Sequence, residues 1–171
     1  MNRYQFIEDQ ANNLVDKYNT RNPYTILKNL GVEILPFKGK TKLLGMYTRI
    51  LSTSFVFYNP DNSYEMKKMV FAHELGHHIL HQEEALKDKI FEFELFNIEN
   101  SLETEANLFA SHLLIDQKEV LDLASLDYTY DQIASSLNVN VNLLLFKISE
   151  MNRKQNILKL LPEIDNKFLR S

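Results

Sequence analysis

With 171 residues, 44% of them hydrophobic, and a formal net charge of -4, the chain can bury one main core, and its acidic balance argues against a protein that binds mainly to nucleic-acid phosphates. The absence of cysteine excludes disulfides, thiolate zinc ligands and cysteine nucleophiles, so any metal needs histidine and carboxylate ligands. No apolar run reaches the ~20 residues of a membrane span and no apolar leader follows Met1, so we expect a soluble, cytoplasmic protein.

The first third of the chain predicts two helices and a small antiparallel sheet. Apolar residues between Tyr4 and Tyr18 recur at steps of three and four, which is typical of one face of an amphipathic helix. Asn22, Pro23 and Gly31 are suited to be the N-cap, the first position and the stop of a short second helix. Runs rich in β-branched and aromatic residues predict strands over 32–37, 43–51 and 54–59.

The segment after the sheet contains His73, Glu74 and His77 in the spacing His-Glu-x-x-His, a zinc-metallopeptidase signature. Asn62 and Glu65 form a possible capping box at the start of its helix. Residues four apart lie only ~40° apart around a helix, so the two histidines can bind one tetrahedral Zn²⁺. Glu74 lies ~100° further round, where it suits a general base better than a ligand. The preceding sheet supports a peptidase, since an edge strand beside the metal can pair with an extended peptide.

The sequence predicts a helix over 101–114 that carries candidates for the third ligand. The face that bears Glu103 also carries small residues, including Ala106 and Ala110, so this helix can approach Gly76 of the motif helix closely. A glycine inside a helix costs about 1 kcal/mol relative to alanine, and close packing gives it a purpose. We therefore expect Glu103 to be the third ligand.

Other side chains on or near this helix have different expected roles. Glu105 and Glu99 are the alternative third ligands, since only geometry distinguishes the three carboxylates. Asn107, one turn beyond the preferred ligand, can orient a metal-binding imidazole. His112 points away from that face and is expected at the surface.

The remaining segments include one, residues 83–100, whose structure the sequence leaves open. Residues 83–100 mix charges with aromatics and fit a helix, a short strand or a lid over the site. Asp116 can cap a helix that ends near residue 125. Segments 130–137 and 141–151 outline a helix-turn-helix with nearly balanced charges, which favours a packing or partner-docking unit over DNA binding. The tail over 156–171 is expected to form a short helix.

Two sequence motifs together carry a family resemblance. They are the stretch from Phe71 to His81, Phe-Ala-His-Glu-Leu-Gly-His-His-Ile-Leu-His, and the pattern Glu-x-x-Ala-Asn-x-Phe-Ala-Ser that begins at Glu103. Over residues 23–150 the chain resembles the ImmA/IrrE family of metallopeptidases, and in particular its short ImmA-like members from phages and integrative elements. Members often have proline where this chain has Asp116, a departure that touches the next helix rather than the site.

The resemblance implies a zincin-like α+β fold, a zinc cofactor with Glu103 as its third ligand, and proteolytic inactivation of a helix-turn-helix transcriptional repressor. In that fold a small antiparallel sheet packs with the active-site helix and further helices. We expect a metallopeptidase core over 1–125 and a helical C-terminal subdomain over 126–171 packed on it. The expected partner is a protein substrate, with no direct binding to nucleic acid or membrane.

The predicted reaction is peptide-bond hydrolysis at zinc, with Glu74 taking a proton from water and delivering it to the leaving amine. His78, His81 and Tyr47 are candidates for stabilising the oxyanion; otherwise the two histidines are expected at the rim of the site or the surface. Two less specific interpretations are core histidines without metal and a closed, structural zinc site. The alternative function is a repressor-binding antirepressor or toxin-antitoxin partner that does not cleave.

Overall fold

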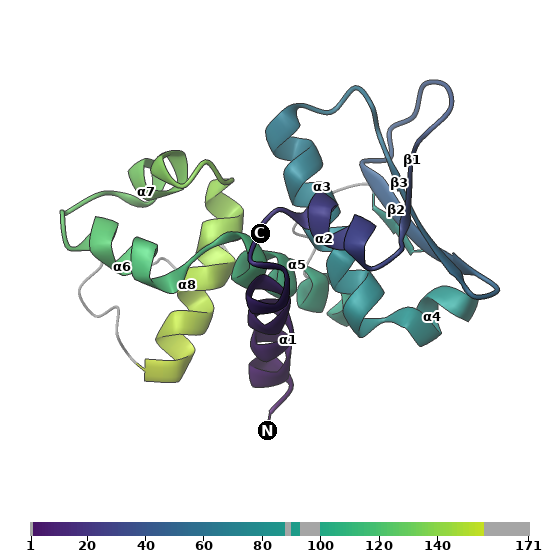
Figure 1. The fold of residues 1–171 in the computed structure, drawn as a ribbon. Coiled ribbons are helices and arrows are strands. Elements are labelled where there is room, and N and C mark those ends of the chain that lie inside the picture. The colour runs from purple at the N-terminus through teal and green to yellow at the C-terminus, as the bar shows by residue number, and fades with distance from the viewer. Residues whose placement is uncertain (1, 88–89, 93–99, 156–171) are drawn as a thin grey trace.

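The computed structural model describes residues 2–87, 90–92 and 100–155, and within them the chain forms eight helices and four strands (Figure 1). The α+β class predicted from the sequence is confirmed. The sheet lies at one side of the molecule and the C-terminal helices at the other, with helices α1 and α5 between them. None of the helices in these residues combines the length and apolarity that a membrane span requires.

The sheet has the strand order β1-β3-β2-β4, with β1 (Glu33–Pro36), β2 (Gly45–Ile50), β3 (Thr53–Tyr58) and β4 (Ile90–Glu92). The predicted antiparallel pairing of the runs 43–51 and 54–59 is confirmed by β2 and β3, but β1 pairs with β3 in parallel, so the sheet as a whole is mixed. The reason is that β2 and β3 form a hairpin that turns at Leu51, and β3 inserts between β2 and β1. The chain also reverses between β1 and β2, so β3 runs in the same direction as β1, the strand that it lies beside.

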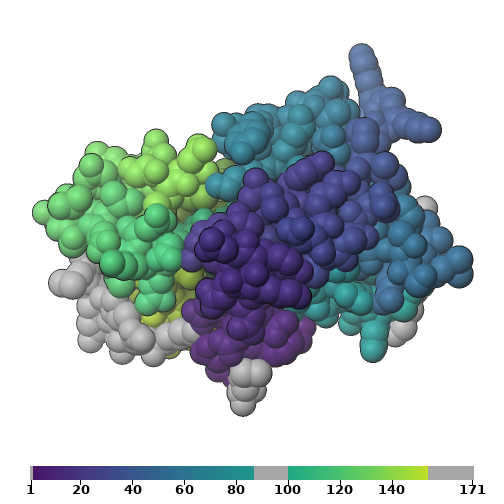
Figure 2. Space-filling model, viewed as in Figure 1, coloured from purple at the N-terminus to yellow at the C-terminus, as the bar shows by residue number. Residues whose placement is uncertain are grey.

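Two capped helices open the chain, α1 (Arg3–Tyr18) and α2 (Pro23–Asn29). The side chain of Asn22 accepts a hydrogen bond from the first turn of α2, and Gly31 follows that helix with a φ of 75°. Both predicted helices and the predicted cap at Asn22 are confirmed. The N-terminal segments cover the front of the molecule between the C-terminal helices and the sheet side (Figure 2).

The motif lies on α3 (Tyr64–Leu80), in which every residue from 69 to 77 is buried. Its N-cap is Ser63, whose hydroxyl accepts the Met66 N–H at 3.1 Å. The predicted cap at Asn62 is wrong, because that side chain instead donates to the carbonyl of Leu44. The helix is thus anchored at its start and enclosed at its middle, where the motif lies.

Helix α5 (Ser101–Leu114) packs along α3, as the small residues on its face predicted. A methyl group added to Gly76 would lie 3.1 Å from Ala106 Cα and 3.2 Å from its carbonyl oxygen. Contacts this close mean that a side chain at position 76 would have to push the backbone of α5 away by a few tenths of an ångström. The glycine therefore allows the separation at which Glu103 can reach α3.

The rest of the described chain is α4 (Gln82–Lys87), α6 (Gln117–Ala124), α7 (Tyr130–Ser136) and α8 (Val141–Gln155). The undecided segment 83–100 thus contains a short helix and the strand β4, and Glu99 lies outside the described residues. The predicted cap at Asp116 is confirmed, since its side chain accepts the Lys118 N–H. The tail over 156–171 also lies outside the described residues, and the boundary near 125 stays a prediction.

Candidate metal centre

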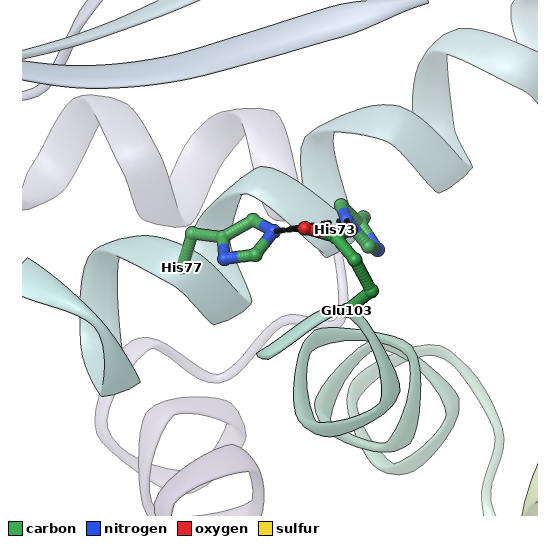
Figure 3. Close-up of side chains that lie close together, drawn as sticks. All are labelled: His73, His77 and Glu103. Carbon is green, nitrogen blue, oxygen red and sulfur yellow. Dashed lines mark hydrogen bonds and ion pairs between the residues drawn. The ribbon is translucent and has the colours of Figure 1, made fainter. Parts of the chain in front are cut away.

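Three side chains from α3 and α5 point toward one another (Figure 3). The Nε2 atoms of His73 and His77 are 3.0 Å apart, and Glu103 Oε2 is 3.0 Å from His73 Nε2. The other oxygen of Glu103 lies 3.6 Å from His77 Nε2. One potential ligand atom from each residue lies within 4.8 Å of the other two. The structure thus brings together the three residues that the sequence predicted as ligands.

A buried amide holds the ring of His73 from behind. Asn107 Oδ1 lies 3.0 Å from His73 Nδ1, and because an amide oxygen only accepts, Nδ1 carries the proton and donates. The lone pair of His73 is then on Nε2, which faces the cluster. This contact confirms the predicted position of Asn107 beside the imidazole of His73, a candidate ligand.

The donor set fits a metal ion. His73 Nε2 presents a lone pair to a carboxylate oxygen at 3.0 Å, and two acceptors at that distance repel each other unless a cation or a proton lies between them. Burial lowers the pKa of His77 to about 4, an effect that Glu103 opposes and the neighbouring histidines reinforce. That imidazole is neutral at pH 7, as metal binding requires. Two imidazoles and one carboxylate are a ligand set typical of zinc with an open position.

Glu74, the predicted base, is 0% exposed and lies where α3 meets the sheet. Its carboxylate fills space left by Gly45, the first residue of β2. A methyl group at Gly45 would lie 2.6 Å from Val70 Cγ1 and closer still to Glu74 Oε1. Sequence reasoning missed this role of Gly45, although a glycine in a strand is a general sign of close approach by other atoms.

His81 is placed differently from the prediction of a rim or surface residue. It is 1% exposed, and its Nδ1 lies 2.9 Å from Nδ1 of His77, on the side of that ring away from the cluster. It therefore lies behind the candidate ligand His77, away from the donor atoms that converge in the cluster. The sequence signal was available, because His81 follows His77 by four residues.

The other two oxyanion candidates contact each other. The Tyr47 hydroxyl lies 3.1 Å from Nδ1 of His78 and 3.2 Å from the Ser54 hydroxyl. Burial raises the pKa of Tyr47, and burial lowers the pKa of His78 to about 4. Their assignment to the oxyanion stays a prediction.

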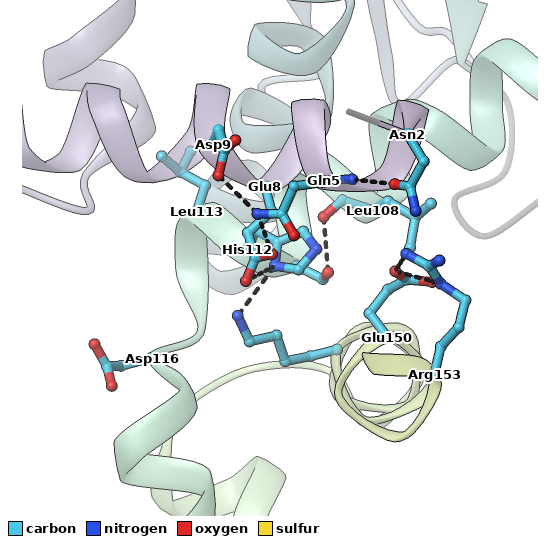
Figure 4. A network of polar contacts seen from close by, with 12 residues as sticks. Asn2, Gln5, Glu8, Asp9, Leu108, His112, Leu113, Asp116, Glu150 and Arg153 are labelled. Carbon is cyan, nitrogen blue, oxygen red and sulfur yellow. Dashed lines mark hydrogen bonds and ion pairs between the residues drawn. The ribbon is translucent and has the colours of Figure 1, made fainter. Parts of the chain in front are cut away.

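The prediction that His112 lies at the surface is wrong. The side chain is 2% exposed in a polar network where α1, α5 and α8 meet (Figure 4). Lys147 Nζ lies 3.1 Å from its Nδ1, and Glu8 Oε1 lies 3.9 Å away. Burial lowers the pKa of His112 to about 3 and that of Lys147 to about 8. Helices α1 and α8 cover the sides of α5 that face away from the cluster, so a side chain that points away from the cluster is not exposed to solvent there.

An α+β protein whose enclosed helix carries His-Glu-x-x-His, with a second carboxylate brought beside it by the neighbouring helix, has the features of a metallopeptidase. The family model of peptidase M78, described as the IrrE N-terminal-like domain, matches residues 27–149, and the chain belongs to this family. The predicted resemblance is thereby confirmed.

The chain is also similar to a phage protein, the "Uncharacterized immunity region protein 2" of Bacillus phage phi105. The two are 29% identical over 131 residues, which make up 77% of this chain and 82% of the phage protein.

Proposed function

We propose that this protein is a zinc-dependent endopeptidase with a zincin-like fold, whose metal ligands are His73, His77 and Glu103. The observation that carries the proposal is the convergence of one donor atom from each of these residues within 4.8 Å, at a site where the two histidines are buried. These three residues would hold the zinc ion, which would supply Lewis acidity toward a water molecule and toward the carbonyl of the bond to be cut.

Glu74 acts as the general base and acid. It takes the proton from the attacking water and later delivers it to the leaving amine. Its carboxylate is packed between α3 and the glycine that begins β2, which fixes the position of the carboxylate. A base held in place loses little of its effect to reorientation during the reaction.

The substrate is proposed to bind as an extended strand along the sheet. β4 is the outermost strand on the side of β2, and its Glu92 pairs with Gly45, the residue against which Glu74 packs. The outer edge of β4 pairs with no further strand within the described residues. The backbone groups along that edge can hydrogen-bond an extended peptide.

The proposed substrate is a helix-turn-helix repressor. The resemblance to short ImmA-like members supports this choice, and so does the similarity to a phage protein named for an immunity region. Cleavage of such a repressor would make the protein an antirepressor of a phage or mobile element.

The Glu74→Gln variant tests the reaction, because the amide keeps the size of the side chain and removes its basicity. We expect zinc to be retained and cleavage of a repressor encoded beside this gene to fall by about 10² to 10⁴-fold. Cleavage at the wild-type rate would contradict the proposal. Relief of repression in cells by the uncleaving variant would instead establish the alternative, an antirepressor or toxin-antitoxin partner that works by binding, with structural zinc.

A further inference from the structure

A line of polar contacts leads from His77 to the surface, on the side of the ring that faces away from Glu103. His77 Nδ1 lies 2.9 Å from His81 Nδ1, and His81 Nε2 lies 3.0 Å from Glu105 Oε2. Arg3, in the first turn of α1, donates two hydrogen bonds to Glu105, at 2.9 and 2.5 Å. The contacts join α3, α5 and α1, and the two ends of the Arg3–Glu105 pair are 102 residues apart in sequence.

The donors and acceptors along this line can be assigned in one direction. Arg3 only donates, and its two hydrogen bonds go to both oxygens of Glu105, which therefore accept as a carboxylate. An ionised carboxylate only accepts, so His81 donates from Nε2. With Nε2 donating to Glu105, His81 has its Nδ1 left to accept from Nδ1 of His77. The lone pair of His77 is then on Nε2, at the cluster.

We propose that His81, Glu105 and Arg3 are positioning residues that fix the ring of His77 in its metal-binding tautomer and thereby tighten zinc binding. The inference rests on the proposed function, since it concerns the same site. Asn107 fixes the tautomer of His73 through a single contact. The tautomer of His77 depends on three residues in series, His81, Glu105 and Arg3. Arg3 lies outside the matched residues 27–149, so α1 adds this support from beyond the region that the family model covers.

The zinc dissociation constant measures this role directly. Competition with a chromogenic chelator at pH 7, on the full-length protein after zinc removal, is expected to show that Glu105→Gln weakens binding by about 10 to 100-fold. Arg3→Gln is expected to weaken it less, because the carboxylate remains. The exposed Glu33, on the far edge of the sheet, provides the matched control Glu33→Gln, which is expected to bind zinc as the wild type does.

An effect of these variants on folding must be distinguished from an effect on the position of the His77 ring. Side chains of Arg3 and Glu105 are 47% and 22% exposed, so their replacement leaves the core intact, whereas His81→Phe changes a buried site. We therefore expect the zinc-free Glu105→Gln variant to unfold at the wild-type temperature. The visible absorption bands of its Co²⁺ form are expected to shift, because they report the geometry of the ligands.

The outcomes distinguish the two proposals. If the wild type binds zinc and Glu105→Gln and Arg3→Gln bind it equally tightly, the positioning role is overturned and the proposed function stands. A lower unfolding temperature with unchanged zinc affinity would also overturn the positioning role, since it would show a purely structural contact. If the wild type binds no zinc, the proposed function itself fails, and this inference fails with it.

Discussion

Glu74 and Gly45 form a pair in which the Glu74 carboxylate occupies the space that a side chain at position 45 would need. Any side chain at position 45 would overlap the carboxylate and Val70. Because α3 and β2 are both regular elements, neither can move away without disturbing its neighbours. The position of the proposed base therefore depends on a residue that is not part of the His-Glu-x-x-His motif.

Replacing Gly45 with alanine is expected to reduce cleavage by about 10²-fold, because a displacement near 1 Å at a catalytic group has effects of that order. The zinc ligands lie on other residues, so metal content should remain at the wild-type level. Cleavage assays and zinc analysis of the same preparation provide the measurement and its control. Wild-type cleavage by Gly45→Ala would show that this packing does not position the base.

At the scale of the helices and strands, α5 serves two different contacts. One face meets α3 at the candidate metal centre, and another carries His112 into the polar network with α1 and α8. Lys147 donates to the neutral ring of His112, which stays unprotonated because burial lowers its pKa to about 3. Protonation of this ring in the folded protein would place two buried cations side by side.

This arrangement predicts a loss of stability in mild acid. The pKa of His112 is about 3 when folded and ~6.5 when unfolded, so the unfolded chain binds more protons between these values. The contribution is complete above pH 6.5 and is lost as the pH falls toward 3, by at most about 1.4 kcal/mol per pH unit. Denaturant unfolding between pH 7 and 4.5 measures the slope.

The matched variant is His112→Gln, whose amide oxygen can still accept from Lys147. Its free energy of unfolding is expected to fall less steeply with pH than that of the wild type. Some slope should remain, because the pKa values of His77 and His78 are lowered in the same direction. Equal slopes in the two proteins would contradict the assignment of this effect to His112.

Helices were predictable from the sequence where the residues that define them lie within a few positions of one another. Caps such as Asn22 and Asp116 bond to residues within three positions of themselves, and apolar periodicity marked the buried face of α1. The errors came from contacts distant in sequence. Asn62 is engaged by the carbonyl of Leu44, which leaves the cap to Ser63, and β1 is parallel because a later strand inserts beside it.

For the molecule as a whole, the sequence predicted the three residues that meet at the candidate metal centre, but it did not predict the residues that surround them. Spacing places His73 and His77 on one side of a helix, and the small face of α5 indicated Glu103. No pattern in the sequence relates Arg3 to Glu105, since only the folded chain brings α1 against α5. The residues that hold the site in place are therefore drawn from more of the chain than the motif suggests.

The proposed function requires that α3 and α5 together hold a single zinc ion. The most direct test is the zinc content of the purified protein, measured by elemental analysis for the wild type, for Glu103→Ala and for the exposed control Glu65→Ala. We expect one zinc per chain in the wild type and in the control, and loss of zinc in Glu103→Ala. A wild type without zinc, or a Glu103→Ala variant that retains a full equivalent, would contradict the claim.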